Sequence, residues 1–284
     1  MKFVYIGYDF MLDAVHQLIA QGHELVGVCS FPCDNRFIFN VQTEALCEVM
    51  QIDFIVDPLR DVHIKDFVDQ GAECFLSAGY PHKIPAMFDD SIEGKKIYAL
   101  NVHPTLLPLG RSVLPAPHVL LNHPEASGVT IHKLAERLDA GDIIAQEPLP
   151  IHEGESVETL SARIVLKARS LLTGIFEDID KLYQNAVPQD DDKATHWEVP
   201  TDVMRTLDWN KPVKQIQKIQ RAFGYYGSLA FFNNEAWHVF DADVWEEEHD
   251  HNVGDVVANL GAQLVIAASD GFVCLKLIEK LEKN

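Results

Sequence analysis

Positive charge is scarce in this sequence of 284 residues. Lysine and arginine together number 23, whereas aspartate and glutamate number 43, so the formal net charge is -20. A surface this acidic repels phosphate groups and supplies little of the Lys/Arg neutralisation on which nucleic-acid affinity depends. The composition therefore argues against a nucleic-acid partner, although a local basic patch would still allow a tRNA to bind.

Paired cysteines and long apolar runs are missing as well. The five cysteines are scattered and odd in number, so we expect no disulfide framework. Cys29 and Cys33 lack a second pair, and WEEEHDH, with His249 and His251, is more typical of a solvated loop, so no metal is expected. No run approaches the roughly 20 apolar residues that span a bilayer, and MKFVYIGYDF has the pattern of a first strand rather than of a signal peptide. We therefore expect a cytoplasmic protein without membrane contact.

Strand and helix patterns alternate through the first two thirds of the sequence. Short apolar runs such as FVYIGY, ELVGVC and ECFLSAG are separated by segments with apolar residues at helical spacing. This pattern predicts a Rossmann-like, mostly parallel α/β sheet with flanking helices, which we assign to residues 1–187. The turn after the first run, GYDF, lacks the GxGxxG of a dinucleotide site, so the sheet alone does not indicate NAD.

The pattern changes after a polar, proline-bounded stretch at residues 188–202, which we predict to be a linker. Beyond it, runs such as YYGSLAFF, AWHVFDADVW and QLVIAAS are joined by NN, LGA and SDG turns. These runs predict a small all-β, OB- or barrel-like C-terminal domain over residues 203–284. The edges of such a sheet could pair in a homodimer.

Polar residues interrupt the apolar pattern at two strand ends. Asn101 and His103 flank Val102, so both side chains project to the same side of an extended strand. Asp139 follows GVTIHKLAERL, and it reaches His103 if the GVTIHKL strand adjoins the IYALNV strand. A carboxylate orients an imidazole, and an amide can donate to a developing oxyanion.

No Ser or Cys nucleophile adjoins these residues, so the set suits attack on a carbonyl by an external nucleophile. Each residue separately also has a structural explanation: Asn101 as a loop cap, His103 as a satisfied core histidine and Asp139 as a turn cap. Their combination at one end of the sheet favours catalysis.

Three stretches carry a resemblance to a known family: FLSAGYPHKIP, NVHPTLLP and GVTIHKLAERLDAGDIIAQ. In this order they resemble the formyltransferases that use 10-formyltetrahydrofolate, and the flanking architecture extends the likeness over nearly the whole chain. The resemblance implies that Asn101, His103 and Asp139 are catalytic and that 10-formyltetrahydrofolate is the co-substrate. It further implies folate contacts from Ser77, Ala78, Gly79, Tyr80, Lys83, Ile84, Leu138, Ala140, Gly141 and Asp142.

The resemblance also implies that Tyr8, Arg111 and Ser112 bind the acceptor. Two positions depart from the family pattern: Ser112 stands where glycine often follows the arginine, and Asp142 stands where many members carry proline. Both departures bear on the shape of the substrate sites and not on the three catalytic positions.

Several acceptors fit this family. We favour a primary amine on a nucleotide-linked amino-deoxysugar, as in lipopolysaccharide biosynthesis, because FPCDNRFIFNVQ is short and poor in cations where the methionyl-tRNA formyltransferases carry a longer basic insertion. Methionyl-tRNA formylation is the alternative, and a non-catalytic folate-binding protein is the alternative of another class. The purine-pathway transformylase and the formyltetrahydrofolate hydrolase fit the domain organisation less well.

Overall fold

The computed structural model describes residues 1–35, 38–85, 91–92 and 94–281. The chain divides into two units. The first comprises residues 1–115, 126–150 and 162–198, and the second comprises residues 116–125, 151–161 and 199–284. Residues 188–198, most of the predicted linker, thus belong to the first unit. Two earlier segments join the second unit, which the sequence pattern did not indicate.

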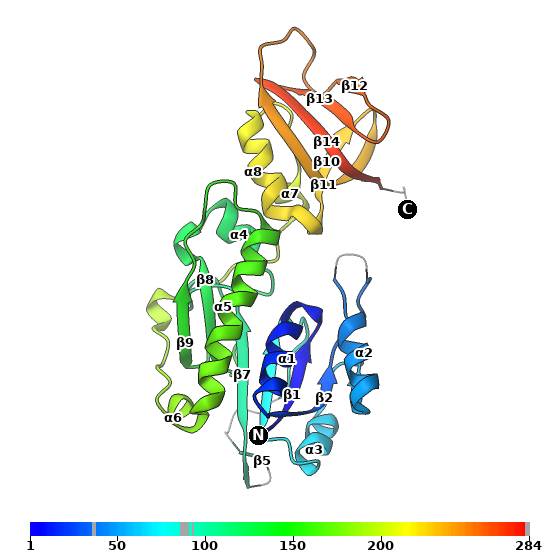
Figure 1. Ribbon diagram of the computed structural model, residues 1–284. Helices are drawn as coiled ribbons and strands as arrows, with labels where there is room; N and C mark the ends of the chain where they lie inside the picture. Colours follow the sequence, from blue (N-terminus) through cyan, green and yellow to red (C-terminus); the bar gives the residue numbers. More distant parts are fainter. Residues whose placement is uncertain (36–37, 86–90, 93, 282–284) are drawn as a thin grey trace. The chain divides into compact units, whose positions relative to one another are not determined.

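A seven-stranded sheet forms the centre of the first unit (Figure 1). Its order is β3-β2-β1-β4-β7-β8-β9; the first five strands are parallel, β8 is antiparallel to β7, and β9 is antiparallel to β8. The strands are β1 (Lys2–Gly7), β2 (Glu24–Cys29), β3 (Asp53–Ile55), β4 (Cys74–Ala78), β7 (Tyr98–His103), β8 (Gly128–Lys133) and β9 (Ile143–Pro148), with a small separate pair, β5 (Ser91–Ile92) and β6 (Lys95–Lys96).

Helices connect these strands. They are α1 (Leu12–Ala20), α2 (Val41–Met50), α3 (Asp61–Asp69), α4 (Ala116–Leu121), α5 (Val157–Glu177) and α6 (Ile179–Gln184), with 3-10 turns η1 (Asp9–Met11), η2 (Pro124–Ala126) and η3 (Asp191–Lys193). This architecture confirms the predicted Rossmann-like α/β fold, and the pairing of β7 with β8 confirms that the GVTIHKL and IYALNV strands are neighbours.

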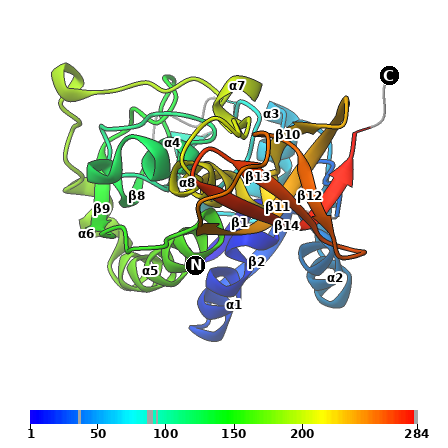
Figure 2. The same ribbon diagram turned by 90° about the horizontal axis from the view of Figure 1, so that it is seen from above.

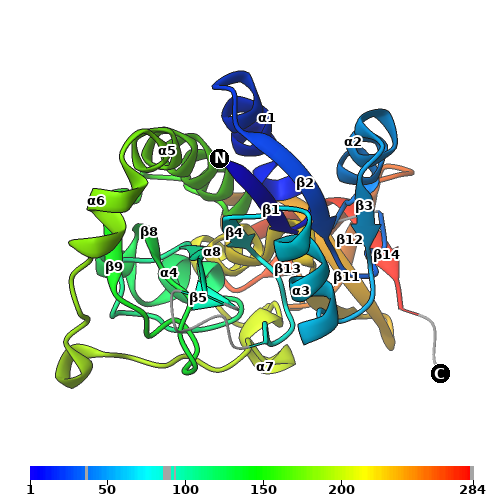
Figure 3. The same cartoon turned by 90° about the horizontal axis from the view of Figure 1, so that it is seen from below.

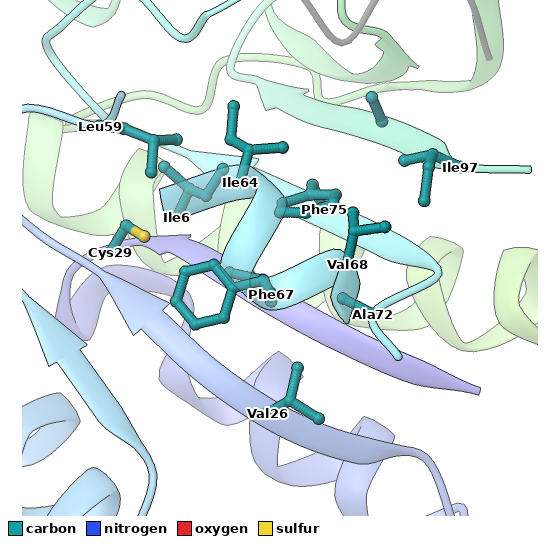
Figure 4. Packing of buried hydrophobic residues seen from close by; sticks show 12 residues of the cluster. Ile6, Val26, Cys29, Leu59, Ile64, Phe67, Val68, Ala72, Phe75 and Ile97 are labelled. Carbon is teal, nitrogen blue, oxygen red and sulfur yellow. The ribbon is translucent and has the colours of Figure 1, made fainter. Parts of the chain in front are cut away.

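Both faces of the sheet are covered because its strands are apolar on both sides. On β1, Val4 and Ile6 point into a buried cluster with Phe67 of α3 (Figure 4). Phe3 points to the other face, where its ring meets Phe176 of α5 edge-on at a centroid distance of 5.9 Å. Figure 3 shows α1 and α5 on one side of the sheet and α3 on the other. Such two-sided burial is what near-continuous apolar strands require.

The second unit contains a five-stranded antiparallel sheet of order β10-β11-β14-β13-β12 (Figure 2). The β10–β11 hairpin turns through Asn233 and Asn234, whose φ values of 52° and 60° suit a two-asparagine turn. Val213 and Ile216, one helical turn apart, pack α8 onto the sheet. The elements are α7 (Asp202–Arg205), α8 (Val213–Phe223), η4 (Gly224–Tyr226), β10 (Ser228–Phe232), β11 (Glu235–Glu246), β12 (Val256–Asn259), β13 (Leu264–Ala268) and β14 (Gly271–Lys280).

The all-β part of the C-terminal prediction is therefore confirmed as an antiparallel sheet. Within the described residues, no helix is both long and apolar enough to cross a membrane.

The α3 side of the sheet yields a stability prediction. Phe67→Ala removes a ring that is 1% exposed, so we expect a loss of about 3–5 kcal/mol in the free energy of unfolding of the first unit, from lost transfer energy and the cavity left behind. Val62→Ala, at a position 51% exposed on the same helix, should change it by less than about 0.5 kcal/mol. Urea unfolding followed by circular dichroism measures both variants, and equal losses would contradict the packing described.

Candidate active site

The carboxyl end of β7 presents the first two polar residues of the site. In the parallel pairing with β4, Ser77 lies opposite Asn101, and in the antiparallel pairing with β8, His132 lies opposite Asn101. His103 ends the strand and is 3% exposed. Because alternate strand residues share a face, Asn101 and His103 lie on the same side of the sheet.

The loop between β8 and β9 brings Asp139 to this strand end. Asp139 has a φ of 51°, a left-handed conformation that Asp adopts more readily than most side chains. A Cβ at Gly141 would lie 1.9 Å from the carbonyl oxygen of Lys133, so only glycine allows the loop to return this closely. The AGD sequence thus turns the carboxylate back toward β7.

The three predicted catalytic side chains meet here. His103 Nδ1 lies 3.5 Å from Asp139 Oδ2, and Asn101 Nδ2 lies 3.5 Å from Asp139 Oδ1. The backbone N–H of Ser112 donates to Asp139 Oδ2 at 3.2 Å, and His103 Nε2 lies 3.0 Å from the carbonyl oxygen of Gly110. The predicted convergence of amide, imidazole and carboxylate is therefore present, and the catalytic role of each residue stays a prediction.

A second histidine belongs to this cluster and was not predicted. His132 is 1% exposed, and its Nδ1 lies 2.7 Å from the carbonyl oxygen of Lys133, which can only accept. Its Nε2 is therefore the accepting nitrogen in the neutral ring and receives a hydrogen bond from Asn101 Nδ2 at 3.1 Å. Asp139 Oδ1 is an acceptor too. The Asn101 amide nitrogen therefore faces both His132 and Asp139, and this fixes which way the amide is oriented. The sequence signal for His132 was an ionisable ring beside the apolar residues of the run GVTIHKL.

Burial and charge shift the pKa values of the pair in the same direction. Burial lowers the pKa of His103 below its ordinary value, because it removes the hydration of the imidazolium; Asp139 and the Gly110 carbonyl act against this, whereas His132 adds to it. For Asp139, burial alone raises the pKa, but His103, His132 and the Ser112 N–H outweigh it and hold the pKa below its ordinary value. At neutral pH the site therefore contains a carboxylate beside an imidazole that can accept a proton.

The residues predicted to contact folate lie on two loops beside this cluster. Ser77 and Ala78 end β4 and are buried, and Gly79 follows with a φ of 67°. In the second loop Leu138 is 57% exposed, and Asp142 forms an ion pair with Lys133 at 3.8 Å. The others are distributed as follows: Lys83 is exposed, Tyr80, Ile84 and Ala140 are half-buried, and Gly141 is buried.

The residues predicted to bind the acceptor are in three different settings. The ring of Tyr8 is half-buried against Phe31, with centroids 5.5 Å apart. Ser112 is buried, and its backbone N–H holds Asp139. The Arg111 side chain is only 1% exposed and forms an ion pair with Asp191 at 2.9 Å, a partner that the sequence pattern did not suggest.

Metal ligands do not cluster anywhere in the described parts of the chain: no group of three or more His, Cys, Asp or Glu side chains there could hold an ion. The cluster at β7 offers an amide, two imidazoles and a carboxylate.

A buried imidazole–carboxylate pair at the carboxyl edge of an open α/β sheet, where such folds bind ligands, can serve in general acid–base catalysis. Comparison with known proteins names the group. The family model described as formyl transferase matches residues 60–174, and the model described as formyl transferase, C-terminal domain, matches residues 201–284. The chain belongs to the formyltransferase family, whose members are enzymes that transfer formyl groups.

Individual proteins agree with this assignment. The methionyl-tRNA formyltransferase of Streptococcus equi subsp. equi is 27% identical over 221 residues, which cover 78% of this chain and 69% of the relative. HypX from Aquifex aeolicus, solved in complex with tetrahydrofolic acid, shares the fold with a TM-score of 0.73 at 18% identity over 100% of this chain, which spans only 45% of HypX. The sugar 3N-formyl transferase WlaRD, solved in the presence of dTDP and 5-N-formyl-THF, has a TM-score of 0.61 at 18% identity, covering 100% of this chain and 99% of WlaRD.

The depressed pKa of Asp139 makes the stability of the fold depend on pH. Because the folded state holds its proton less tightly than the unfolded state, this carboxylate contributes stability at neutral pH that is lost as the pH falls from about 5 towards 3. Asp139→Asn lacks this contribution, so the difference in unfolding free energy between wild type and variant should narrow over that range.

Urea unfolding at several pH values measures this difference, and Asp13→Asn, at an exposed position on α1, is the matched control. If the wild-type and Asp139→Asn curves ran parallel from pH 7 to pH 3, the electrostatic account of the site would be wrong.

Proposed function

We propose that this protein transfers the formyl group of 10-formyltetrahydrofolate to a primary amine. The observation that carries the proposal is the convergence of Asn101, His103 and Asp139. His103 Nδ1 lies 3.5 Å from Asp139 Oδ2, and both of these side chains are almost inaccessible to solvent. HypX with tetrahydrofolic acid and WlaRD with 5-N-formyl-THF have the same fold, which supports a folate as the donor.

The chemistry follows from the roles that these groups can take. The amine nitrogen attacks the formyl carbon, and a tetrahedral intermediate with an oxyanion forms. One N–H of Asn101 is held by His132 at 3.1 Å, which keeps the amide in place, and the second, whose 3.5 Å contact with Asp139 is long, is available to the oxyanion. In neutral His103, Nε2 donates to the Gly110 carbonyl oxygen, so Nδ1 takes the proton that the amine loses, and Asp139, 3.5 Å from Nδ1, stabilises the resulting imidazolium. The bond from the formyl carbon to N10 then breaks, the proton passes to N10, and the products are a formamide and tetrahydrofolate.

The loops beside the cluster suit a flat, polar heterocycle such as the folate pterin. Ser77 is directly opposite Asn101 in the sheet, so the chain that follows β4 begins beside the reacting groups. Gly79 and Gly141 let the two loops turn tightly against Tyr8 and Lys133, and backbone N–H and C=O groups of such loops can match the donors and acceptors of a pterin edge. We propose that residues 77–84 and 138–142 bind the folate on these grounds.

For the acceptor we propose a nucleotide-linked amino-deoxysugar. The net charge of -20 disfavours a large polyanion, and three of the five described lysines of the second unit are in ion pairs with carboxylates. Lys214 pairs with Glu246, Lys276 with two aspartates, and Lys280 with Glu235. The name of WlaRD, a sugar 3N-formyl transferase, supports the same acceptor class.

Methionyl-tRNA is the second candidate. It is favoured by the name of the Streptococcus relative and by the match of residues 201–284 to the C-terminal formyl transferase model. The two candidates differ in charge: the tRNA needs an extended cationic surface, whereas a sugar nucleotide needs two or three donors for a diphosphate.

His103→Ala should abolish formyl transfer and leave folate binding nearly unchanged, because the imidazole moves a proton but does not frame the pterin. We expect a fall in kcat of at least about a hundredfold. Release of tetrahydrofolate measures turnover, and fluorescence titration with 5-formyltetrahydrofolate measures binding. His16→Ala, at an exposed position on α1, is the control. Wild-type turnover in His103→Ala would refute the catalytic assignment.

A comparison of the two acceptors in the same assay distinguishes the candidates. With 10-formyltetrahydrofolate in excess, we expect tetrahydrofolate release with amino-deoxysugars linked to dTDP, UDP or GDP, and none with methionyl-tRNA. We expect this preference because the acidic surface repels the tRNA. Since the sugar nucleotide does not depend on an extended cationic surface, raising the salt concentration should affect the sugar reaction little. Turnover with the charged tRNA alone would establish the second candidate in place of the first.

A further inference from the structure

The side chain of Gln189 is hydrogen-bonded to the loop that carries Asp139. Its Nε2 donates to the carbonyl oxygen of Asp139 at 2.8 Å and to that of Gly141 at 2.7 Å. These two carbonyls flank Ala140, and they belong to the part of the loop in which Asp139 has a positive φ. Both amide hydrogens of Gln189 are thus used to hold one short turn.

Arg111 fixes the orientation of the Gln189 amide. Its Nε and one terminal nitrogen donate to Gln189 Oε1 at 3.2 and 2.9 Å, and Asp191 accepts from the same terminal nitrogen. Since a guanidinium can only donate, the amide oxygen must face Arg111 and the amide nitrogen must face the loop. The burial of Arg111 is explained by these partners, because a buried charge needs a counter-charge and hydrogen bonds.

Residues 189–195, which contain Gln189, also bind Gly110, the residue whose carbonyl oxygen contacts His103. Gly110 donates its backbone N–H to Thr195 Oγ1 at 2.7 Å, and Arg111 donates its backbone N–H to the Thr195 carbonyl oxygen at 2.9 Å. The carbonyl oxygen of Gly110 is the group that His103 Nε2 contacts. Residues 189–195 therefore support the groups on both sides of the catalytic imidazole.

We propose that Gln189 is a positioning residue for formyl transfer: through its two hydrogen bonds to the Asp139 loop, it sets the distance between the Asp139 carboxylate and the His103 ring. This inference rests on the function proposed above. It assigns a role in catalysis to a residue 50 positions beyond Asp139, within the stretch that the sequence pattern indicated to be a linker.

The geometry explains why such support matters. The Asp139–His103 contact is 3.5 Å long, near the outer limit of a useful hydrogen bond, so a small shift of the loop would lose it and a small closure would strengthen it. A left-handed residue other than glycine is conformationally costly and relaxes when its surroundings release it. Gln189 restrains the backbone carbonyl of this residue, whereas the Ser112 N–H holds its carboxylate.

Gln189→Glu tests the proposal with almost no change in volume. The carboxylate still accepts from Arg111, but it cannot donate to the two carbonyl oxygens and places an acceptor against them. We expect kcat to fall on the order of ten- to a hundredfold, with the KM for the amine changed less than about threefold. The acid limb of the pH–rate profile should move to lower pH, since Asp139, which raises the pKa of His103 against the effects of burial and of His132, would stand farther off.

Gln184→Glu, the same substitution at an exposed position on α6, is the control and should retain wild-type kinetics. The decisive measurement is a double-mutant cycle with Asp139→Asn. If Gln189 acts through Asp139, adding Gln189→Glu to Asp139→Asn should cost less than about threefold in kcat. Full additivity, or a wild-type kcat and pH profile in Gln189→Glu, would overturn the proposal.

Two further outcomes keep the inference separate from the function on which it rests. If wild type and Gln184→Glu release no tetrahydrofolate with any amine, the proposed function fails. If Gln189→Glu does not fold, Gln189→Met, which is neutral and of similar size, takes its place in the same cycle. Loss of folding in both variants would assign Gln189 to stability alone and overturn the positioning role.

Discussion

A carboxylate held beside an imidazole, away from water, is the interaction on which the site depends. The charged form of each group would be unstable there alone, since burial disfavours the charge on Asp139 and the proton on His103. Together with His132 and Ser112 they form a set in which each polar group has a partner. The sheet makes this possible because β4, β7 and β8 bring three polar positions into register at one edge.

The fold was largely readable from hydrophobic pattern. Short apolar runs alternating with amphipathic helices predict parallel strands whatever the loops contain. The pairing of β7 with β8 entered the sequence argument only as a condition, and the structure meets it. The early segments of the second unit, residues 116–125 and 151–161, were not readable. The helix α4 in the first of them is only six residues long, and its partners lie about a hundred residues further along. Local patterns carry no information about a contact over that separation.

The site was readable only in part, for a similar reason. Asn101, His103 and Asp139 are conspicuous because each is polar where its neighbours are apolar. Gln189 is not conspicuous, since a glutamine in a polar, acidic stretch has the expected character of a solvated segment, and only its approach to the Asp139 loop shows a different role. Arg111 shows the converse: the family resemblance implies an acceptor contact, which stays a prediction, and the sequence pattern did not indicate the partners Gln189 and Asp191 that allow its burial.

The two units interleave along the polypeptide, since residues 116–125 and 151–161 belong with the C-terminal sheet while residues 126–150 and 162–198 belong with the N-terminal one. A single cut cannot release either body intact. Exchange of the C-terminal part, residues 199–284, between relatives would combine residues 116–125 and 151–161 of one parent with the C-terminal sheet of the other. The C-terminal part is therefore constrained to diverge together with residues 116–125 and 151–161, which belong to the same unit.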